Sequence, residues 1–196
     1  AKHNTYYGSN VTESEIMTAY NEAEQLLTVT LIRQLEAMTT TLNECYREAE
    51  RICTEKELEI QRLINQADTL NVLMADEIFD ETIAEAVNAR YSNDGRISAI
   101  GIHLESLQTA FDLQCQKYDD AITALQATLT TAKELLGKQA NEALGVGIAE
   151  AEAIANKADK TSTKASTYKE LTDANESLKA IVESINQEIG KKLEEA

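Results

Sequence analysis

Residues 12–52 read "TESEIMTAYNEAEQLLTVTLIRQLEAMTTTLNECYREAERI", and this stretch decides the fold. Its apolar residues recur at steps of three and four, with one extra step of four, and neither glycine nor proline interrupts them. This spacing places them on one face of an α-helix and is typical of a coiled-coil seam. The seam consists of Ile16, Tyr20, Ala23, Leu27, Leu31, Leu35, Met38, Leu42, Cys45, Ala49 and Ile52.

The start and the length of this first helix follow from the same pattern. Thr12 and Glu15 have the spacing of a capping box, in which the Thr12 side chain accepts a hydrogen bond from the backbone N–H of Glu15. The apolar stripe resumes at Leu63, Ala67 and Leu70, so we predict one rod over residues 12–70 that follows an N-terminal extension, residues 1–11. At about 1.5 Å per residue the rod is on the order of 85 Å long.

Two further helical regions are expected. Asn93, Asp94 and Gly95 form a turn signal, and a second rod follows over residues 97–137. Its seam is Ile97, Ile100, Leu104, Leu107, Phe111, Cys115, Tyr118, Ile122, Leu125, Leu129, Ala132 and Leu136. Residues 138–196 form a third helical region, in which small residues of "ALGVGIAEAEAIA" suit close helix packing and a polar loop is predicted near 156–166.

Residues 71–96 continue neither seam, and we interpret them as a small head at one end of the rods. Met74 and Phe79 are candidate contact residues there, with the alternative that both plug the end of the bundle. Residues 1–196 are therefore predicted to form a single all-α domain. Its expected architecture is an elongated antiparallel helical bundle of three to four long helices with a small helical head.

The composition supports a helical protein and excludes several partners. The 196 residues include no proline and only seven glycines, which indicates nearly continuous helix. The formal net charge of −16 repels phosphate backbones and anionic lipid, so we expect neither nucleic-acid binding nor membrane attachment by charge. No apolar run approaches the roughly 20 residues that cross a bilayer.

The three cysteines suggest a cross-link between the rods. Cys45 and Cys53 are roughly 12 Å apart along one helix, too far for a disulfide. In antiparallel rods, pairing Cys115 with Cys53 or with Cys45 puts the hairpin midpoint near residue 84 or 80, within the predicted head. We therefore predict a bond from Cys115 to Cys53 or to Cys45. The alternative is three buried thiols in a reducing compartment.

No motif for catalysis, cofactor binding or metal binding is found in the sequence. There is no CxxC, His3 and His103 lie far apart, and no glycine-rich phosphate loop occurs. We expect no enzyme activity, no cofactor and no metal. Asn10 begins the glycosylation tripeptide Asn10-Val11-Thr12, with the alternative that Thr12 serves only as a helix cap.

Three stretches carry a resemblance to a known family: "NEAEQLLTVTLIRQLEAMTTTLNECYREAERIC", "LTTAKELLGKQANEAL" and "GIAEAEAIANKADK". With the acidic, proline-free composition, they resemble the glutamic acid/alanine-rich surface coat proteins of African trypanosomes. That family is related in fold to the variant surface glycoproteins and the haptoglobin–haemoglobin receptor. The likeness is one of composition and rod pattern over most of the chain.

The resemblance implies a glycoprotein on the extracellular face of the plasma membrane, held there by a GPI-type lipid anchor. Its function would be a protective layer, and its partners would be neighbouring coat molecules. The chain stops at "EIGKKLEEA" without an attachment signal, so the anchor is expected outside this sequence. Two alternatives are a surface receptor of the same helical family that binds a protein ligand at the head, and a soluble amphipathic-helix lipid carrier.

Overall fold

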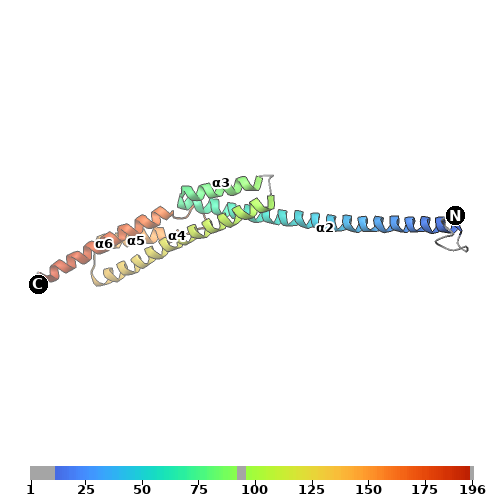
Figure 1. The fold of residues 1–196 in the computed structure, drawn as a ribbon. Coiled ribbons are helices and arrows are strands. Elements are labelled where there is room, and N and C mark those ends of the chain that lie inside the picture. Colours follow the sequence, from blue (N-terminus) through green and yellow to red (C-terminus); the bar gives the residue numbers. More distant parts are fainter. Residues whose placement is uncertain (1–11, 92–95, 195–196) are drawn as a thin grey trace. The chain divides into compact units, whose positions relative to one another are not determined.

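The computed structural model describes residues 12–91 and 96–194, and these contain five helices and no strand (Figure 1). The helices are α2 (Glu13–Met74), α3 (Glu77–Tyr91), α4 (Arg96–Lys138), α5 (Glu142–Ala155) and α6 (Tyr168–Glu194). The predicted all-α helical class is confirmed. The predicted second rod, residues 97–137, agrees with α4 to within one residue at each end.

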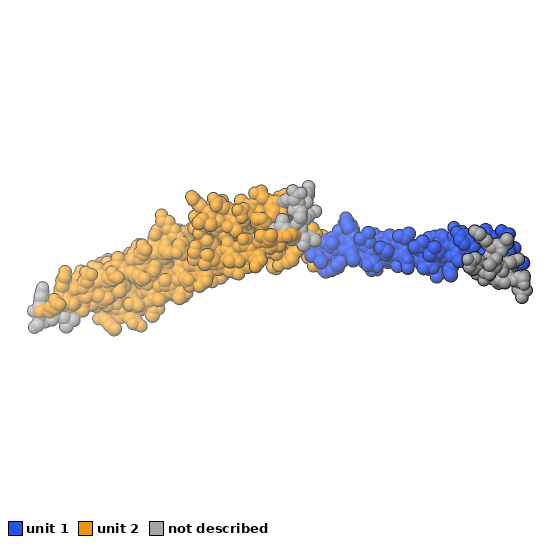
Figure 2. Space-filling model, viewed as in Figure 1, with its two compact units in different colours: residues 1–52 blue, residues 53–196 orange. Residues whose placement is uncertain are grey.

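The chain divides into two compact units, Ala1–Ile52 and Cys53–Ala196, where we predicted a single domain (Figure 2). The described part of unit 1 is the first part of α2, a helix of 62 residues. Its start is the predicted capping box: the Thr12 backbone N–H donates to Glu15 Oε2 (2.7 Å), and the Glu15 N–H donates to Thr12 Oγ1 (3.3 Å). The sequence therefore located the first helix correctly.

Unit 2 begins with a three-helix bundle made of the end of α2, all of α3 and the start of α4. Asn71 donates to Asp80 (3.2 Å) and Arg90 donates to Gln61, so α3 runs back along α2. The predicted head, residues 71–96, is thus mostly a helix that packs lengthwise against its neighbours. The core of this bundle is Ile60, Leu63, Ile64, Ala67, Leu70, Phe79, Ile83, Ala86, Ile100 and Leu107.

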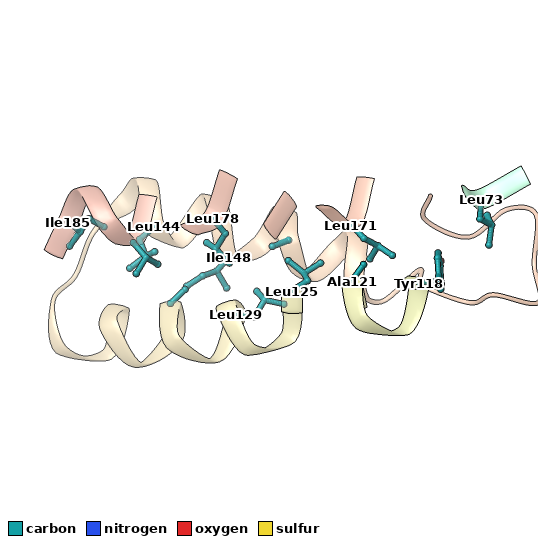
Figure 3. Packing of buried hydrophobic residues seen from close by; sticks show 13 residues of the cluster. Leu73, Tyr118, Ala121, Leu125, Leu129, Leu144, Ile148, Leu171, Leu178 and Ile185 are labelled. Carbon is teal, nitrogen blue, oxygen red and sulfur yellow. The ribbon is translucent and has the colours of Figure 1, made fainter. Parts of the chain in front are cut away.

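A second three-helix bundle in unit 2 uses the rest of α4 with α5 and α6. Its core includes Tyr118, Leu125, Leu129, Leu144, Ile148, Leu171, Leu178 and Ile185 (Figure 3). A Cβ atom added to Gly147 would lie 2.8 Å from Ile181 Cδ1, so α5 and α6 approach closely at this glycine. This is the close packing expected for the small residues of "ALGVGIAEAEAIA".

The direction of the helices in unit 2 differs from the prediction. We expected the two rods to be antiparallel, but α3 returns the chain between them, so the end of α2 and α4 run the same way (Figure 1). Gln114 of α4 accordingly contacts Asp76, which lies just after the end of α2 (2.9 Å). The physical reason is that residues 77–91 have an apolar face of their own and bury it against both neighbours.

Residues 156–167 connect α5 and α6 without forming a helix, close to the predicted loop at 156–166. Hydrogen bonds from buried side chains hold this connection against α4 and α5. The Tyr118 hydroxyl donates to the Ser166 carbonyl (2.5 Å), and the Ser166 hydroxyl donates to the Ile154 carbonyl (2.8 Å). A second capping box, Thr167 with Glu170, begins α6. The loop is therefore an ordered part of the bundle.

Candidate functional site

Most of the exposed large apolar side chains lie in unit 1, and seven of them belong to the seam from Ile16 to Ile52, which we call the open seam. We expected the second rod to cover it. Instead, none of residues 12–52 is buried, and Leu42 is 71% exposed. The large apolar side chains exposed in unit 1 are Met17, Tyr20, Leu26, Leu27, Val29, Leu31, Ile32, Leu35, Met38, Leu42, Tyr46 and Ile52.

The helix of unit 1 lacks the usual source of helix stability. Helices in proteins are stabilised mainly by burying an apolar face, and isolated helices are marginal in water. The composition adds little, because six threonines and a valine have weak helix propensity. Most of those threonine hydroxyls donate to the carbonyl four residues earlier, as Thr39 does to Leu35 (2.8 Å). A helix of this kind points to a partner that covers its apolar face.

Charges in unit 1 lie mostly away from the open seam. Residues 13–52 contain eight Glu and three Arg. At about 100° per residue, Glu22, Arg33 and Arg47 fall on the side of the helix opposite the seam. At the seam's edge, Gln34 and Thr41 are uncharged, whereas Glu24 lies at the same angle as Leu42. An apolar strip with few charges suits contact with another apolar helix.

A second candidate site is a cleft of about 560 Å³ in unit 2, between α2, α4 and the loop before α6. Its lining residues are Arg62, Asn65, Gln66, Thr69, Phe111, Asp112, Cys115, Lys160 and Thr161. Lys160 pairs with Asp119 (2.6 Å), and this hydrogen bond raises the lysine pKa. Burial raises the pKa of the Cys115 thiol, which lowers the fraction of the reactive thiolate.

The cysteines are free thiols in the structure, and the predicted bond from Cys115 is not formed. Cys53 does not reach Cys115 because the end of α2 and α4 run in the same direction. Gln114 contacts Asp76, so Cys115 is level with the end of α2, whereas Cys53 lies about 21 residues upstream of Met74. That is roughly 30 Å along the helix, against the roughly 7 Å that a disulfide spans. Cys45 is exposed in unit 1.

The other predicted site residues have different surroundings from those expected. Phe79 is 1% exposed in the first core of unit 2, and Met74 is half-buried against both cores. The alternative that these residues fill the bundle interior therefore fits better than a contact surface. Asn10 lies outside the described residues, while Thr12 serves as the helix cap.

Asp76 joins the start of α3 to α4 and was missed by the sequence reasoning. Its Oδ1 accepts from the Phe79 backbone N–H (3.0 Å), its Oδ2 accepts from Gln114 (2.9 Å), and Lys117 Nζ lies 3.6 Å away. The backbone hydrogen bond, the Gln114 amide and the lysine charge hold the Asp76 pKa below its usual value. The signal in the sequence was the position of Asp76 one residue before a helix.

In residues 12–91 and 96–194, no group of three or more His, Cys, Asp and Glu side chains is placed to hold a metal ion. No described helix is long and apolar enough to cross a membrane. No protein-family model, curated protein sequence or solved structure matches this chain. The open seam is therefore the surface from which a function is best argued.

Proposed function

We propose that this chain is a structural cell-surface protein, held by a lipid anchor and packed against neighbouring copies in a protective layer. The observation that carries the proposal is the open seam, an apolar helix face about forty residues long that none of the described residues of unit 1 covers. Such a face needs a helical neighbour. A layer of identical helical proteins would supply one at every position.

The interior of unit 2 supports a static role over catalysis. Its two cores consist almost entirely of apolar side chains, and burial raises the pKa of the Cys115 thiol in its cleft. The acidic surface favours solubility and mutual spacing in a crowded layer. The proposed location in a cell-surface coat rests on the family resemblance.

The two alternatives find less support. A receptor that uses the 71–96 segment would not use the predicted contact residue Phe79, which is buried, although Val72, Ile78 and Tyr91 are exposed there. A lipid carrier would need its helices to separate. Buried or half-buried hydrogen bonds resist this, such as those from Tyr118 to Ser166 and from Thr128 to Asn175 (2.6 Å).

The proposal is tested on intact cells that express the full-length protein. A membrane-impermeant biotin reagent should label it, and a phospholipase that cleaves lipid anchors should release it into the medium. A known cytosolic protein measured in the same cells controls for leakage. Labelling only after the cells are lysed would contradict the surface role.

A further inference from the structure

We propose that the open seam is the interface of a homodimer, in which two copies of residues 13–56 pack as an antiparallel two-stranded coiled coil. Glu13 of each helix then lies opposite Lys56 of the other. This inference goes beyond the proposed coat function, because the contact follows from the helix itself wherever the protein resides.

The two ends of the open seam carry opposite charges. Glu13 precedes Ile16 by three residues and Lys56 follows Ile52 by four, so both lie on the spacing of the seam. In the single chain Lys56 pairs with Glu59, in an exposed contact of 2.7 Å that contributes little. A parallel, in-register pair would place glutamate against glutamate and lysine against lysine. An antiparallel pair places Glu13 against Lys56 at both ends, and charge complementarity therefore selects this direction.

The same alignment, centred between residues 34 and 35, matches the apolar residues by size. It places Leu27 opposite Leu42 and Leu31 opposite Met38, close to the centre. Further out, the large Tyr20 side chain meets the small Ala49. A parallel pair would stack tyrosine on tyrosine and alanine on alanine, which makes the helix separation uneven. Close packing along a constant separation favours the antiparallel pair.

The length of the seam is enough for a stable dimer. From Ile16 to Ile52 the mean spacing is about 3.6 residues, the period of a straight helix, so the seam stays on one side throughout. Burying a large apolar side chain removes roughly 60–120 Å² from water. Eight such residues on each of two chains bury on the order of 1,300 Å², within the range of stable protein interfaces.

The continuation of the seam shows what kind of partner covers this pattern. Ile60, Leu63, Ala67 and Leu70 follow on the same spacing of α2, and α3 and α4 bury them within unit 2. Beyond Lys56 this stripe of α2 is buried in the first core of unit 2. The large apolar side chains exposed elsewhere in the described residues are spread over four helices: Leu58, Val72, Ile78, Tyr91, Ile102, Leu113 and Val146. A second copy of residues 13–52 therefore offers the matching open face.

The mass of the 196-residue chain in solution tests the dimer. Sedimentation equilibrium at micromolar concentration should give twice the chain mass of 21.6 kDa. Leu31→Glu places a charge at the centre of the interface in both chains and should weaken the dimer at least 100-fold. Val29→Glu is the matched control, because Val29 is similarly exposed (45% against 51% for Leu31) but lies on the opposite side of the helix. This variant should remain dimeric.

Disulfide trapping tests the direction. With Ala23→Cys, the new thiol lies one residue, about 1.5 Å along the axis, from the level of Cys45 of the second copy in the antiparallel interface, and mild oxidation should give a covalent dimer. Thr40→Cys, on the side opposite the seam, should not.

Glu13→Lys and Lys56→Glu should each weaken the dimer several-fold. The double variant should recover the original affinity, because both pairs are restored with reversed sign.

Several results would overturn the inference: a monomer up to about 100 μM, a larger oligomer, or a dimer that Leu31→Glu leaves intact. An oxidised dimer of the unaltered chain linked through Cys45 to Cys45 would show a parallel coil and would also overturn it. These results are independent of cell-surface labelling. A dimer in a protein found inside cells would contradict the coat function alone.

Discussion

The two parts of α2 carry the same apolar spacing and have opposite surroundings. Leu42 in unit 1 is 71% exposed, whereas Leu70 in unit 2 is 0% exposed. Both are leucines on the same stripe of one helix. Such spacing therefore predicts a helix face that must be covered, but it does not predict which element covers that face. In unit 2 the cover comes from α3 and α4, and in unit 1 we propose that a second copy supplies it.

The largest effect should come from truncating a covered leucine. Leu70→Ala is expected to lower the free energy of unfolding by about 2–5 kcal/mol, because it leaves a cavity in the first core of unit 2. Leu26→Ala truncates an exposed leucine of the same helix, outside the proposed interface. It should change the free energy of unfolding by less than about 0.5 kcal/mol. Urea denaturation followed by circular dichroism measures both. Equal effects would remove the distinction between the two parts of α2.

Asp76→Ala should destabilise unit 2 by about 2–4 kcal/mol, since it removes the cap of α3 and a hydrogen-bond partner of the buried Gln114. The pH dependence follows from the lowered pKa. The carboxylate's contribution is fully present above the ordinary aspartate pKa of 3.8 and is lost as the pH falls through the lower folded value. Asp76→Asn keeps the cap and should cost less, with a flatter stability profile below about pH 4. An unchanged profile would contradict this role of the charge.

Tyr118→Phe should cost about 1–2 kcal/mol. It removes the buried hydroxyl that donates to the Ser166 carbonyl, and this carbonyl is left without that donor. Tyr168→Phe is a control, because Tyr168 is only half-buried. Hydrogen exchange should show faster exchange around residues 156–167 in the Tyr118 variant alone. Unchanged exchange there would mean that other contacts hold the loop.

The smallest effect is expected at the turn that lets α3 return along α2. Ala75 has a φ of 50°, in the left-handed region that favours glycine. Ala75→Gly should therefore raise the free energy of unfolding by up to about 1 kcal/mol, the relief of strain being partly offset by a more flexible unfolded chain. Thermal unfolding measures the change. A clear loss of stability would contradict the strain argument.

The sequence by itself determined the helices. The absence of proline, the Thr12 capping box and the seam spacing act locally, so they located α2 and α4 before any tertiary contact was known. The polar stretch before α6 and the close packing at Gly147 were also predictable. Runs of polar residues favour loops, and small residues allow two helices to approach closely. A second capping box, Thr167 with Glu170, was present in the sequence and went unnoticed.

Only the tertiary structure decided the direction of the rods, the surroundings of Phe79 and Cys115, and the exposure of the open seam. Each depends on whether residues 77–91 form a head or a helix that folds back, and the apolar spacing is compatible with both. The energy that separates the two outcomes comes from burial between distant segments, together with contacts such as Asp76 with Gln114. Helix formation is local and can be predicted from neighbouring residues, whereas the partner of an apolar face is set by the rest of the chain or by another molecule.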